Sequence, residues 1–530
     1  MTSVDPTGAF PYPSRRMPVF ARNVVAASQP LAAHAGLAAM AAGGNAVDAA
    51  LCTAITLTVV EPTSNGLGSD AFAIVWDGTA LHGSNGSGRS PRAWTPERFA
   101  GRTSMPDLGW DAVTVPGAVD VWRRLSERFG RLPFERLFDP AIRYARDGYA
   151  VSPITAFAWR TAERRYAAFP EFVRTFLPLG RAPQPGETFR CEALAKSLED
   201  IAATRGESFY RGALAERIAA AAAAEGGAMT REDLAAHAAL DVRPLAVPFG
   251  EVELHELPPN GQGLAALVAI GVLERCGIRE TAPDSTESFH LQIEAMKLGI
   301  AAASRHVADP DAMERTPDSL VAPAFLDELA RHVDPKRARP LSRTLPTERG
   351  TVYLAAADAE GRMVSFIQSN YAGFGSGVVV PGTGISLQNR GRGFTLQEGH
   401  PNRVAGGKRP FHTIIPAFVT RAGAPVMAFG VMGGAMQPQG HLQMMVRIFA
   451  HGQDPQAASD APRWFVDEVG AVVVEAGFPR AAAEGLRTRG HHIAVGGTFG
   501  LFGGAQLVRR LGDGYEAASD SRKDGQAAGF

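Results

Sequence analysis

A polar segment from Asp334 to Gly350 divides this chain into two parts with different sequence patterns. The segment is basic and is interrupted by three prolines, so it predicts an exposed connector. Helical patterns dominate the part before it, whereas strand-like runs follow it at 351–357, 363–369, 378–380, 414–420, 426–430 and 472–475. This order predicts an α+β fold whose sheets draw strands from both parts and carry helices on the outside.

The composition excludes several classes of protein. With 45% hydrophobic and 20% charged residues, the 530-residue chain can bury a core. Its net charge of −1 gives no basic excess for nucleic acid or for an anionic membrane surface. The longest uncharged apolar run, 49–60, is too short to span a bilayer, and the first residues lack the pattern of a secretory signal. We therefore expect a cytoplasmic protein with neither nucleic-acid nor membrane partners.

Motifs for metals, disulfides and nucleotides are also missing from the sequence. Cys52, Cys191 and Cys276 are odd in number and far apart, which argues against a disulfide scaffold and against a cysteine zinc site. The sequence contains no GxSxG, HExxH or GxxxxGK pattern. We expect no metal and no cofactor.

A β-hairpin is predicted directly after the connector. Residues 351–358 and 362–369 are separated by a three-residue loop that ends in Gly361, a favoured hairpin connection. In that register Thr351 lies opposite Ser369, and opposed residues share one face with Cβ atoms roughly 4.5–5.5 Å apart. The hairpin thus places two hydroxyl groups side by side at its open end. Two ordinary strand residues are the alternative interpretation, since threonine favours strands.

Thr351 follows the last residue of the connector, Gly350, and this arrangement suits a precursor that cleaves itself. The threonine hydroxyl can attack the carbonyl of Gly350, which has no side chain to block the attack. Cleavage would leave Thr351 as a new N-terminus. Its α-amino group, with an ordinary pKa of about 7.7–8.0, can then act as the base for the hydroxyl of the same residue.

Together with other motifs, these residues resemble the gamma-glutamyltransferase family of N-terminal nucleophile hydrolases. The resemblance covers nearly the whole chain. It rests on several motifs in the family's order: GGNAVDAA at 43–50, EPTSNGLG at 61–68, the segment 351–384, KRP at 408–410 and the glycine pair at 433–434.

The resemblance implies a four-layer αββα sandwich and self-cleavage into a large subunit, 1–350, and a small catalytic subunit, 351–530. The two subunits would form one folded heterodimer, and further dimerisation stays open. Thr351 would be the nucleophile, Ser369 would take the place of a supporting threonine, and Gly433 and Gly434 would supply oxyanion-hole amides. An ordinary turn after the strand is the alternative interpretation of the two glycines.

The segments that bind the amino-acid group of the substrate in this family differ here. The family's carboxylate-binding arginine falls on Ser87, and Arg89 is the nearest substitute. The family's acidic residue for the substrate amine falls on Gly393, beside Arg390 and Arg392, which would repel an ammonium group.

The family's paired serines are replaced by His412 and Thr413. With Arg89, Arg390 and Arg392, they predict a pocket for a carboxylate without a neighbouring ammonium group. Two surface arginines on a glycine turn are the alternative interpretation of Arg390 and Arg392.

In these departures the chain resembles the branch of the family that contains oxamate amidohydrolase and the acylases that remove dicarboxylic side chains from cephalosporins. The predicted function is an autocatalytically processed amide hydrolase that forms an acyl-threonine intermediate. Its expected partner is a small carboxylate-bearing amide, either oxamate-like or with a dicarboxylic acyl group. Two alternatives stay open: a true gamma-glutamyltransferase or glutathione hydrolase, and a non-catalytic binding protein on a degenerate hydrolase scaffold.

Overall fold

The computed structural model describes residues 15–341, 345, 350–497 and 500–530. The first 14 residues, on which the absence of a signal was judged, lie outside the described residues. So do positions 342–344 and 346–349 of the predicted connector. None of the helices in the described part of the chain has both the length and the apolar character that a bilayer crossing demands.

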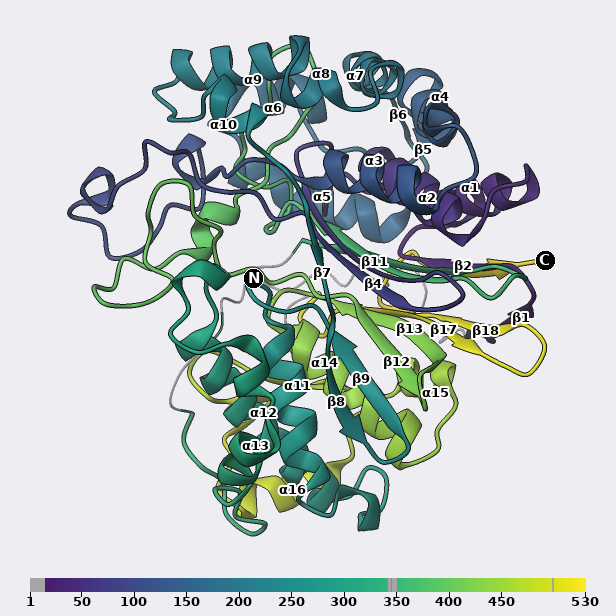
Figure 1. The fold of residues 1–530 in the computed structure, drawn as a ribbon, viewed down its shortest axis with the longest axis vertical. Helices are drawn as coiled ribbons and strands as arrows, with labels where there is room; N and C mark the ends of the chain where they lie inside the picture. The colour runs from purple at the N-terminus through teal and green to yellow at the C-terminus, as the bar shows by residue number, and fades with distance from the viewer. Residues whose placement is uncertain (1–14, 342–344, 346–349, 498–499) are drawn as a thin grey trace.

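Two seven-stranded antiparallel sheets form the centre of the molecule (Figure 1). The first sheet consists, in spatial order, of β19 (Gln526–Gly529), β2 (Val24–Ala27), β10 (Val352–Ala357), β11 (Met363–Ser369), β3 (Asp70–Trp76), β4 (Leu81–Asn85) and β7 (Leu240–Val242). The second consists of β1 (Val19–Ala21), β18 (Tyr515–Ser519), β17 (Gly504–Arg510), β13 (Ala424–Met432), β12 (Ala417–Arg421), β9 (Val252–Glu256) and β8 (Leu245–Phe249). Both sheets take strands from both sides of the connector, as predicted.

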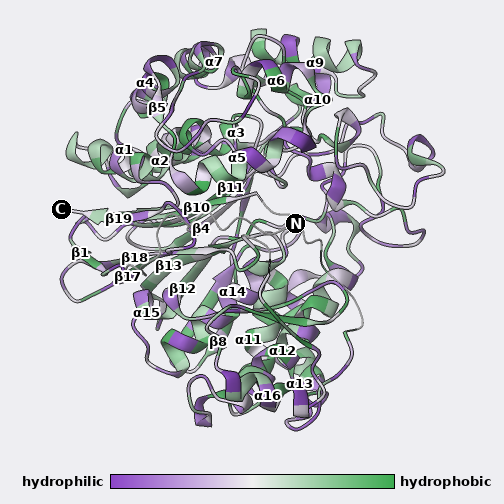
Figure 2. Cartoon of the chain, turned by 180° about the vertical axis from the view of Figure 1, so that it is seen from behind, coloured by the Kyte–Doolittle hydropathy of each residue, from purple (hydrophilic) through white to green (hydrophobic). Residues whose placement is uncertain are grey.

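Helices cover the outer face of each sheet (Figure 1). Over the first sheet lie α1 (Pro30–Ala41), α2 (Ala46–Val60), α3 (Ala118–Phe129), α4 (Asp139–Asp147), α5 (Pro153–Arg165), α7 (Glu192–Ala203) and α9 (Ala213–Ala224). Over the second lie α11 (Gly263–Glu274), α12 (Thr286–His306), α13 (Pro323–Ala330), α14 (Met436–Met445) and α16 (Arg480–Thr488). Figure 2 shows the same arrangement from behind, with hydrophilic and hydrophobic segments alternating along the outer helices.

Three hydrophobic clusters lie between these layers of helices and sheets. One lies between the first sheet and its helices, one lies between the second sheet and its helices, and a third fills the space between the two sheets. The third cluster includes Phe72, Ile74 and Tyr353 from the first sheet and Phe418 and Val508 from the second. Alternate residues of β3, β10 and β11 therefore face the gap between the sheets.

The predicted hairpin is confirmed. Strands β10 and β11 pair from Val352 opposite Gln368 to Ala357 opposite Met363, and Gly361 takes a φ of +93° in the loop. Continued by one residue, this register sets Thr351 opposite Ser369. The prediction of a strand at 378–380 is wrong: Val379 makes only an isolated bridge, because the glycines that flank this segment turn the chain.

Candidate active site

Thr351 lies at the open end of the hairpin with its hydroxyl next to that of Ser369. Thr351 Oγ1 donates to Ser369 Oγ at 3.2 Å, and Ser369 Oγ donates in turn to the carbonyl oxygen of Gly350 at 2.5 Å. The N–H of Tyr371 donates to the same serine oxygen at 2.8 Å. The Ser369 hydroxyl thus links the Thr351 hydroxyl, which could act as a nucleophile, to the Gly350 carbonyl, which that hydroxyl could attack.

Gly350 occupies a position that no larger residue would fit. Its φ is +151°, and a Cβ atom there would lie 2.3 Å from the backbone nitrogen of Gly373 and 3.0 Å from the carbonyl oxygen of Tyr371. Because the nearest atom belongs to the backbone, a side chain at this position would displace the peptide bond that precedes Thr351.

Gly433 and Gly434 follow strand β13 and reach the same place from the second sheet. Among the described residues, the N–H groups of these two glycines donate no hydrogen bond. Gln262 Nε2 donates to the carbonyl oxygen of Gly434 at 2.9 Å and to that of Thr413 at 2.5 Å, which fixes the loop. The loop therefore offers two free amide groups, and Gly433 lines the same cavity as Thr351.

A cavity of about 370 Å³ opens at Thr351. Its described lining combines small polar residues, glycines, a few apolar side chains and one ionisable group: Thr63, Ser64, Phe157, Ala158, Thr161, Gly350, Thr351, Gly373, Met432, Gly433, Gly500, Gly503 and Lys523. A substrate of modest size could bring an amide carbonyl to the threonine there.

Arg390 lies in the interior rather than on the surface, with only 1% of its surface exposed. Its Nη1 donates to Thr413 Oγ1 at 2.7 Å, and its guanidinium carbon lies 4.8 Å from the centre of the Tyr371 ring. Within the described residues, its Nε and Nη2 atoms have no hydrogen-bond partner. A buried guanidinium with two unused donors is suited to bind a carboxylate.

Asp70 and His412 accompany Arg390. Strand β3 pairs with β11 so that Asp70 lies opposite Ser369, which places Thr351, Ser369 and Asp70 in one row. His412 Nε2 lies 3.0 Å from Asp70 Oδ2, and the N–H of Gly117 donates to Asp70 Oδ1 at 3.0 Å.

Burial determines the charges of this group. It raises the pKa of Asp70 to about 7, although the charge of Arg390 opposes the shift. Burial and the same arginine lower the pKa of His412 well below its ordinary value, so this histidine is neutral. Burial also lowers the pKa of Arg390 to about 10, which leaves the guanidinium charged at neutral pH. Arg390, Asp70 and His412 together therefore carry one positive charge when Asp70 is protonated and no net charge when Asp70 is ionised.

None of the three arginines is among the described residues that line the cavity of Thr351: Arg390 lies buried against Thr413 and Tyr371, and the other two lie elsewhere. Arg392 forms an ion pair with Asp107 at 2.7 Å and lines a separate cavity of about 510 Å³. Arg89 pairs with Asp309 at 3.1 Å, donates to the Gly407 carbonyl oxygen and lines a third cavity. Both guanidinium groups are held by acidic partners from distant parts of the sequence, and neither lines the cavity of the threonine.

Sequence reasoning missed Asp70, Tyr371 and Lys523. Asp70 precedes the strand-like run 71–76, but its place opposite Ser369 depends on pairing between strands far apart in the chain. Tyr371 takes a φ of +78°, which its residue type does not indicate. Lys523 reaches the cavity from the C-terminal segment, and no local pattern indicates that. In the described part of the chain, no group of three or more His, Cys, Asp or Glu residues could hold a metal ion.

Comparison with known proteins gives consistent results across the chain. A family model described as gamma-glutamyltranspeptidase matches residues 32–530. An oxamate amidohydrolase proenzyme of Klebsiella pneumoniae is 36% identical over 529 residues, covering 97% of this chain and 99% of that protein. A glutathione hydrolase-like proenzyme of Bacillus subtilis is 34% identical over 526 residues, covering 96% and 98%. The crystal structure of a cephalosporin acylase from Bacillus halodurans superposes with a TM-score of 0.95 at 46% identity, covering 99% of both chains.

Proposed function

The chain belongs to the gamma-glutamyltranspeptidase family and is an enzyme of that family, and we propose that it is a self-processed amide hydrolase with Thr351 as its nucleophile. The observation that carries this proposal is the chain of hydrogen bonds from the Thr351 hydroxyl through Ser369 to the carbonyl of Gly350. Relatives that are proenzymes support a precursor that cuts itself into two subunits.

Self-cleavage would use the groups already in contact. Thr351 Oγ1 attacks the carbonyl carbon of Gly350, the C–N bond breaks, and the hydroxyl proton passes to the freed nitrogen. Water then hydrolyses the ester, which leaves a carboxylate on Gly350 and a free α-amine on Thr351. Ser369 donates to the carbonyl oxygen as negative charge develops on it.

The same residue would then hydrolyse the substrate. The α-amine of Thr351 accepts the proton of Oγ1 as that oxygen attacks the amide carbonyl, and it delivers the proton to the departing amine. Water attacks the acyl-threonine ester, loses its proton to the α-amine and releases a carboxylic acid. The free N–H groups of Gly433 and Gly434 would stabilise the oxyanion in both steps.

Arg390 would bind a carboxylate on the acyl group. Its unused Nε and Nη2 atoms, the adjacent hydroxyl of Thr413 and the neutral His412 support this role. In the uncut chain the ring of Tyr371 covers the guanidinium, and the backbone of Tyr371 packs against Gly350. Departure of Gly350 after cleavage would remove one of the contacts that hold this cover.

We assign the large subunit to 1–350 and the small catalytic subunit to 351–530. Because both sheets contain strands of each subunit, the two would stay together as one heterodimer after cleavage. Two face-to-face sheets with helices outside support the description of the fold as a four-layer αββα sandwich.

The test is a side-by-side assay of the purified, processed protein on oxamate, glutaryl amides and gamma-glutamyl amides. We expect turnover of oxamate or glutaryl amides and little turnover of gamma-glutamyl amides, because the buried charge of Arg390 disfavours a nearby ammonium group. Preferred turnover of a gamma-glutamyl anilide would instead assign a gamma-glutamyltransferase. A processed protein without activity on any of these amides would contradict the proposal.

A further inference from the structure

We propose that Lys523 binds an anionic group on the leaving side of the substrate, so that the preferred substrate carries one carboxylate on each side of the scissile amide. This inference rests on the proposed function and deepens it. Arg390 would take the carboxylate of the acyl group, and Lys523 that of the departing amine, as in a dicarboxylic-acyl derivative of an amino acid.

Lys523 is the one ionisable side chain among the described residues that line the cavity of Thr351. Its hydrocarbon stem crosses Gly504, where a Cβ atom would lie 2.7 Å from the lysine Cγ. Gly504 pairs with Met432, the residue before Gly433, so the lysine stem passes close to the predicted oxyanion amides. The side chain thus reaches into the cavity over a residue that lacks a side chain of its own.

The two cations lie on opposite sides of the nucleophile. In the first sheet, β11 and β3 follow β10 on one side, whereas β2 and β19 follow it on the other. Arg390 lies on the β3 side, because the N–H of Gln388 donates to the carbonyl oxygen of Gly68, just before β3. Lys523 lies on the other side, three residues before β19. An amide placed at Thr351 would therefore extend toward one cation in each direction.

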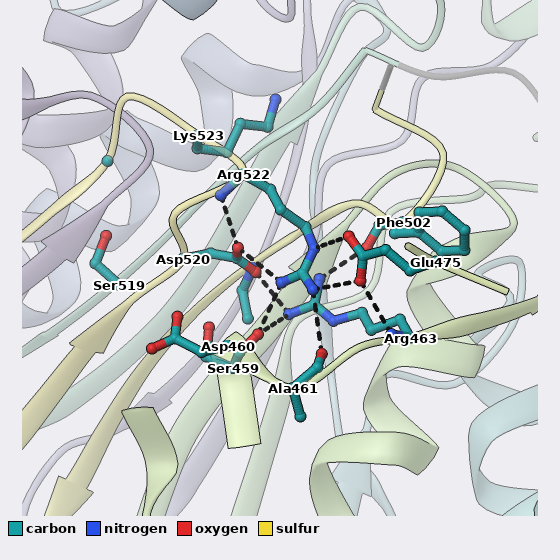
Figure 3. A network of polar contacts seen from close by, with 12 residues as sticks. Ser459, Asp460, Ala461, Arg463, Glu475, Phe502, Ser519, Asp520, Arg522 and Lys523 are labelled. Carbon is teal, nitrogen blue, oxygen red and sulfur yellow. Dashed lines mark hydrogen bonds and ion pairs between the residues drawn. The ribbon is translucent and has the colours of Figure 1, made fainter. Parts of the chain in front are cut away.

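A buried network holds the start of the loop that carries Lys523 (Figure 3). Arg463 Nη2 donates to Asp520 Oδ2 at 2.6 Å, and Arg522 donates to Asp520 Oδ1 at 3.1 Å and to both oxygens of Glu475. Burial works to raise the pKa of Asp520, but the charges of the two arginines outweigh it and hold that pKa below its usual value. Figure 3 shows the amine of Lys523 pointing away from this network.

The next residue, Asp524, fastens the same loop to helix α5. Its carboxylate accepts from the N–H groups of Ile154 and Thr155 at 3.0 and 2.9 Å, and from the hydroxyl of Ser152 at 2.6 Å. Asp524 thereby satisfies N–H groups at the positive end of the helix from a distant part of the chain. Helix α5 carries Phe157, Ala158 and Thr161 of the cavity wall, so one loop positions both the lysine and this wall.

Glu61 holds the amine of Lys523 near the cavity but does not use all of the hydrogen-bond donors of that amine. Lys523 Nζ lies 3.6 Å from Glu61 Oε1, whereas Oε2 accepts from Ser28 at 2.5 Å. Burial raises the pKa of Glu61, and the charge of Lys523 opposes this shift. Since an ammonium group has three donors and this contact exceeds hydrogen-bond distance, Lys523 can take up a carboxylate of a substrate. A purely structural ion pair is the competing interpretation.

Two probes that differ only in charge test the inference: N-glutaryl-glycine and N-glutaryl-glycinamide, with the corresponding oxalyl pair in parallel. The released amine is measured for the wild-type enzyme, Lys523→Met, Lys523→Arg and Lys196→Met. The last variant is the matched control, because Lys196 is exposed and pairs with Glu192 on helix α7. Processing on a denaturing gel shows which variants fold.

We expect the wild-type enzyme to prefer the glycine probe and the preference in kcat/KM to fall about tenfold in Lys523→Met. Lys523→Arg and Lys196→Met should retain it. In the wild-type enzyme, added salt should weaken the preference by screening, a measurement that needs no variant. Equal turnover of both probes by the wild-type enzyme, or an unchanged preference in Lys523→Met, would overturn the inference and leave the proposed function standing. Failure of the wild-type enzyme on all four probes would instead overturn the proposed acyl specificity.

Discussion

Ser369 donates a hydrogen bond to the carbonyl oxygen of Gly350 at 2.5 Å while it accepts one from Thr351. The residue therefore contacts both the hydroxyl that would attack and the carbonyl that would be attacked. The uncut chain thus already brings together the groups that self-cleavage requires. Because Ser369 would later lie beside the mature N-terminus, one hydroxyl would serve both processing and turnover.

Replacing Thr351 by alanine should stop both processing and activity, because it removes the hydroxyl that would attack the Gly350 carbonyl and later the substrate. A denaturing gel should show a single band at 56.0 kDa. The wild-type protein should give bands of about 37 and about 19 kDa, in proportion to subunit length. Thr351→Ser is the matched control, since it keeps the hydroxyl and should still be cut. Complete cleavage of Thr351→Ala would contradict the assignment of the nucleophile.

Ser369→Ala should slow processing roughly a hundredfold, because the Gly350 carbonyl loses its hydrogen-bond donor. The measurement is the time course of precursor loss on a gel. Ser369→Thr retains a hydroxyl and should process at a rate close to that of the wild type. If Ser369→Ala matured as fast as Ser369→Thr, the hydrogen bond to Gly350 would have no part in the reaction.

The hairpin could be predicted because its register depends on local chemistry. A three-residue loop ending in Gly361 sets which residues face each other, so the pairing of Thr351 with Ser369 follows from nearby residues alone. The charge environment could not be predicted in this way. Asp70 reaches Ser369 only through pairing of β3 with β11, which no local pattern determines.

Arg89 also has a contact that the local sequence could not predict. The family's carboxylate-binding arginine falls on Ser87, and Arg89 was expected to substitute for it, but in the folded chain Asp309 binds the Arg89 guanidinium group. The ion pair joins residues far apart in the sequence, so spacing along the chain could not reveal it. Arg390 was placed in the pocket segment by the same comparison with the family, and there the buried surroundings leave two donors unused.

Gly350→Ala should impair processing although it leaves every catalytic group in place. A Cβ atom would lie 2.3 Å from the backbone nitrogen of Gly373, so the scissile carbonyl must shift away from Ser369. A displacement of about 1 Å can cost roughly a hundredfold in rate. Gly512→Ala is the control, because nothing lies within 4 Å of a Cβ atom there. Gel time courses of both variants decide: equal rates would show that Gly350 is not sterically required.

Arg390→Met should raise the KM for a carboxylated amide about tenfold or more, because a charge-assisted hydrogen bond is lost from a buried site. Processing should continue, since Gly350 and Ser369 do not contact the guanidinium directly. Arg392→Met is the comparison variant; it removes a partly exposed partner of Asp107 and should raise KM less. Equal KM values for Arg390→Met and the wild-type enzyme would exclude Arg390 from substrate binding.

The charge around Arg390 should depend on pH through Asp70. The pKa of Asp70 is raised to about 7, so below that pH the carboxyl is neutral and Arg390 keeps an uncompensated charge. Above it the carboxylate offsets the arginine, while His412 stays neutral throughout. The KM for a carboxylated amide should therefore rise as pH increases through about 7. The kcat should also rise with pH, because the α-amine of Thr351, with an ordinary pKa of about 7.7–8.0, must lose its proton to act as a base.

Asp70→Asn separates these two effects. The Ile414 N–H lies 3.4 Å from His412 Nδ1, which assigns the ring proton to Nε2, facing Asp70. Asparagine keeps one side-chain oxygen, which can accept from His412 Nε2 without moving the ring proton, and it is uncharged at every pH, as the protonated carboxyl is. In this variant KM should stay low and flat between pH 6 and 8 while kcat still rises. A KM that climbs with pH as steeply as in the wild-type enzyme would show that another group controls binding.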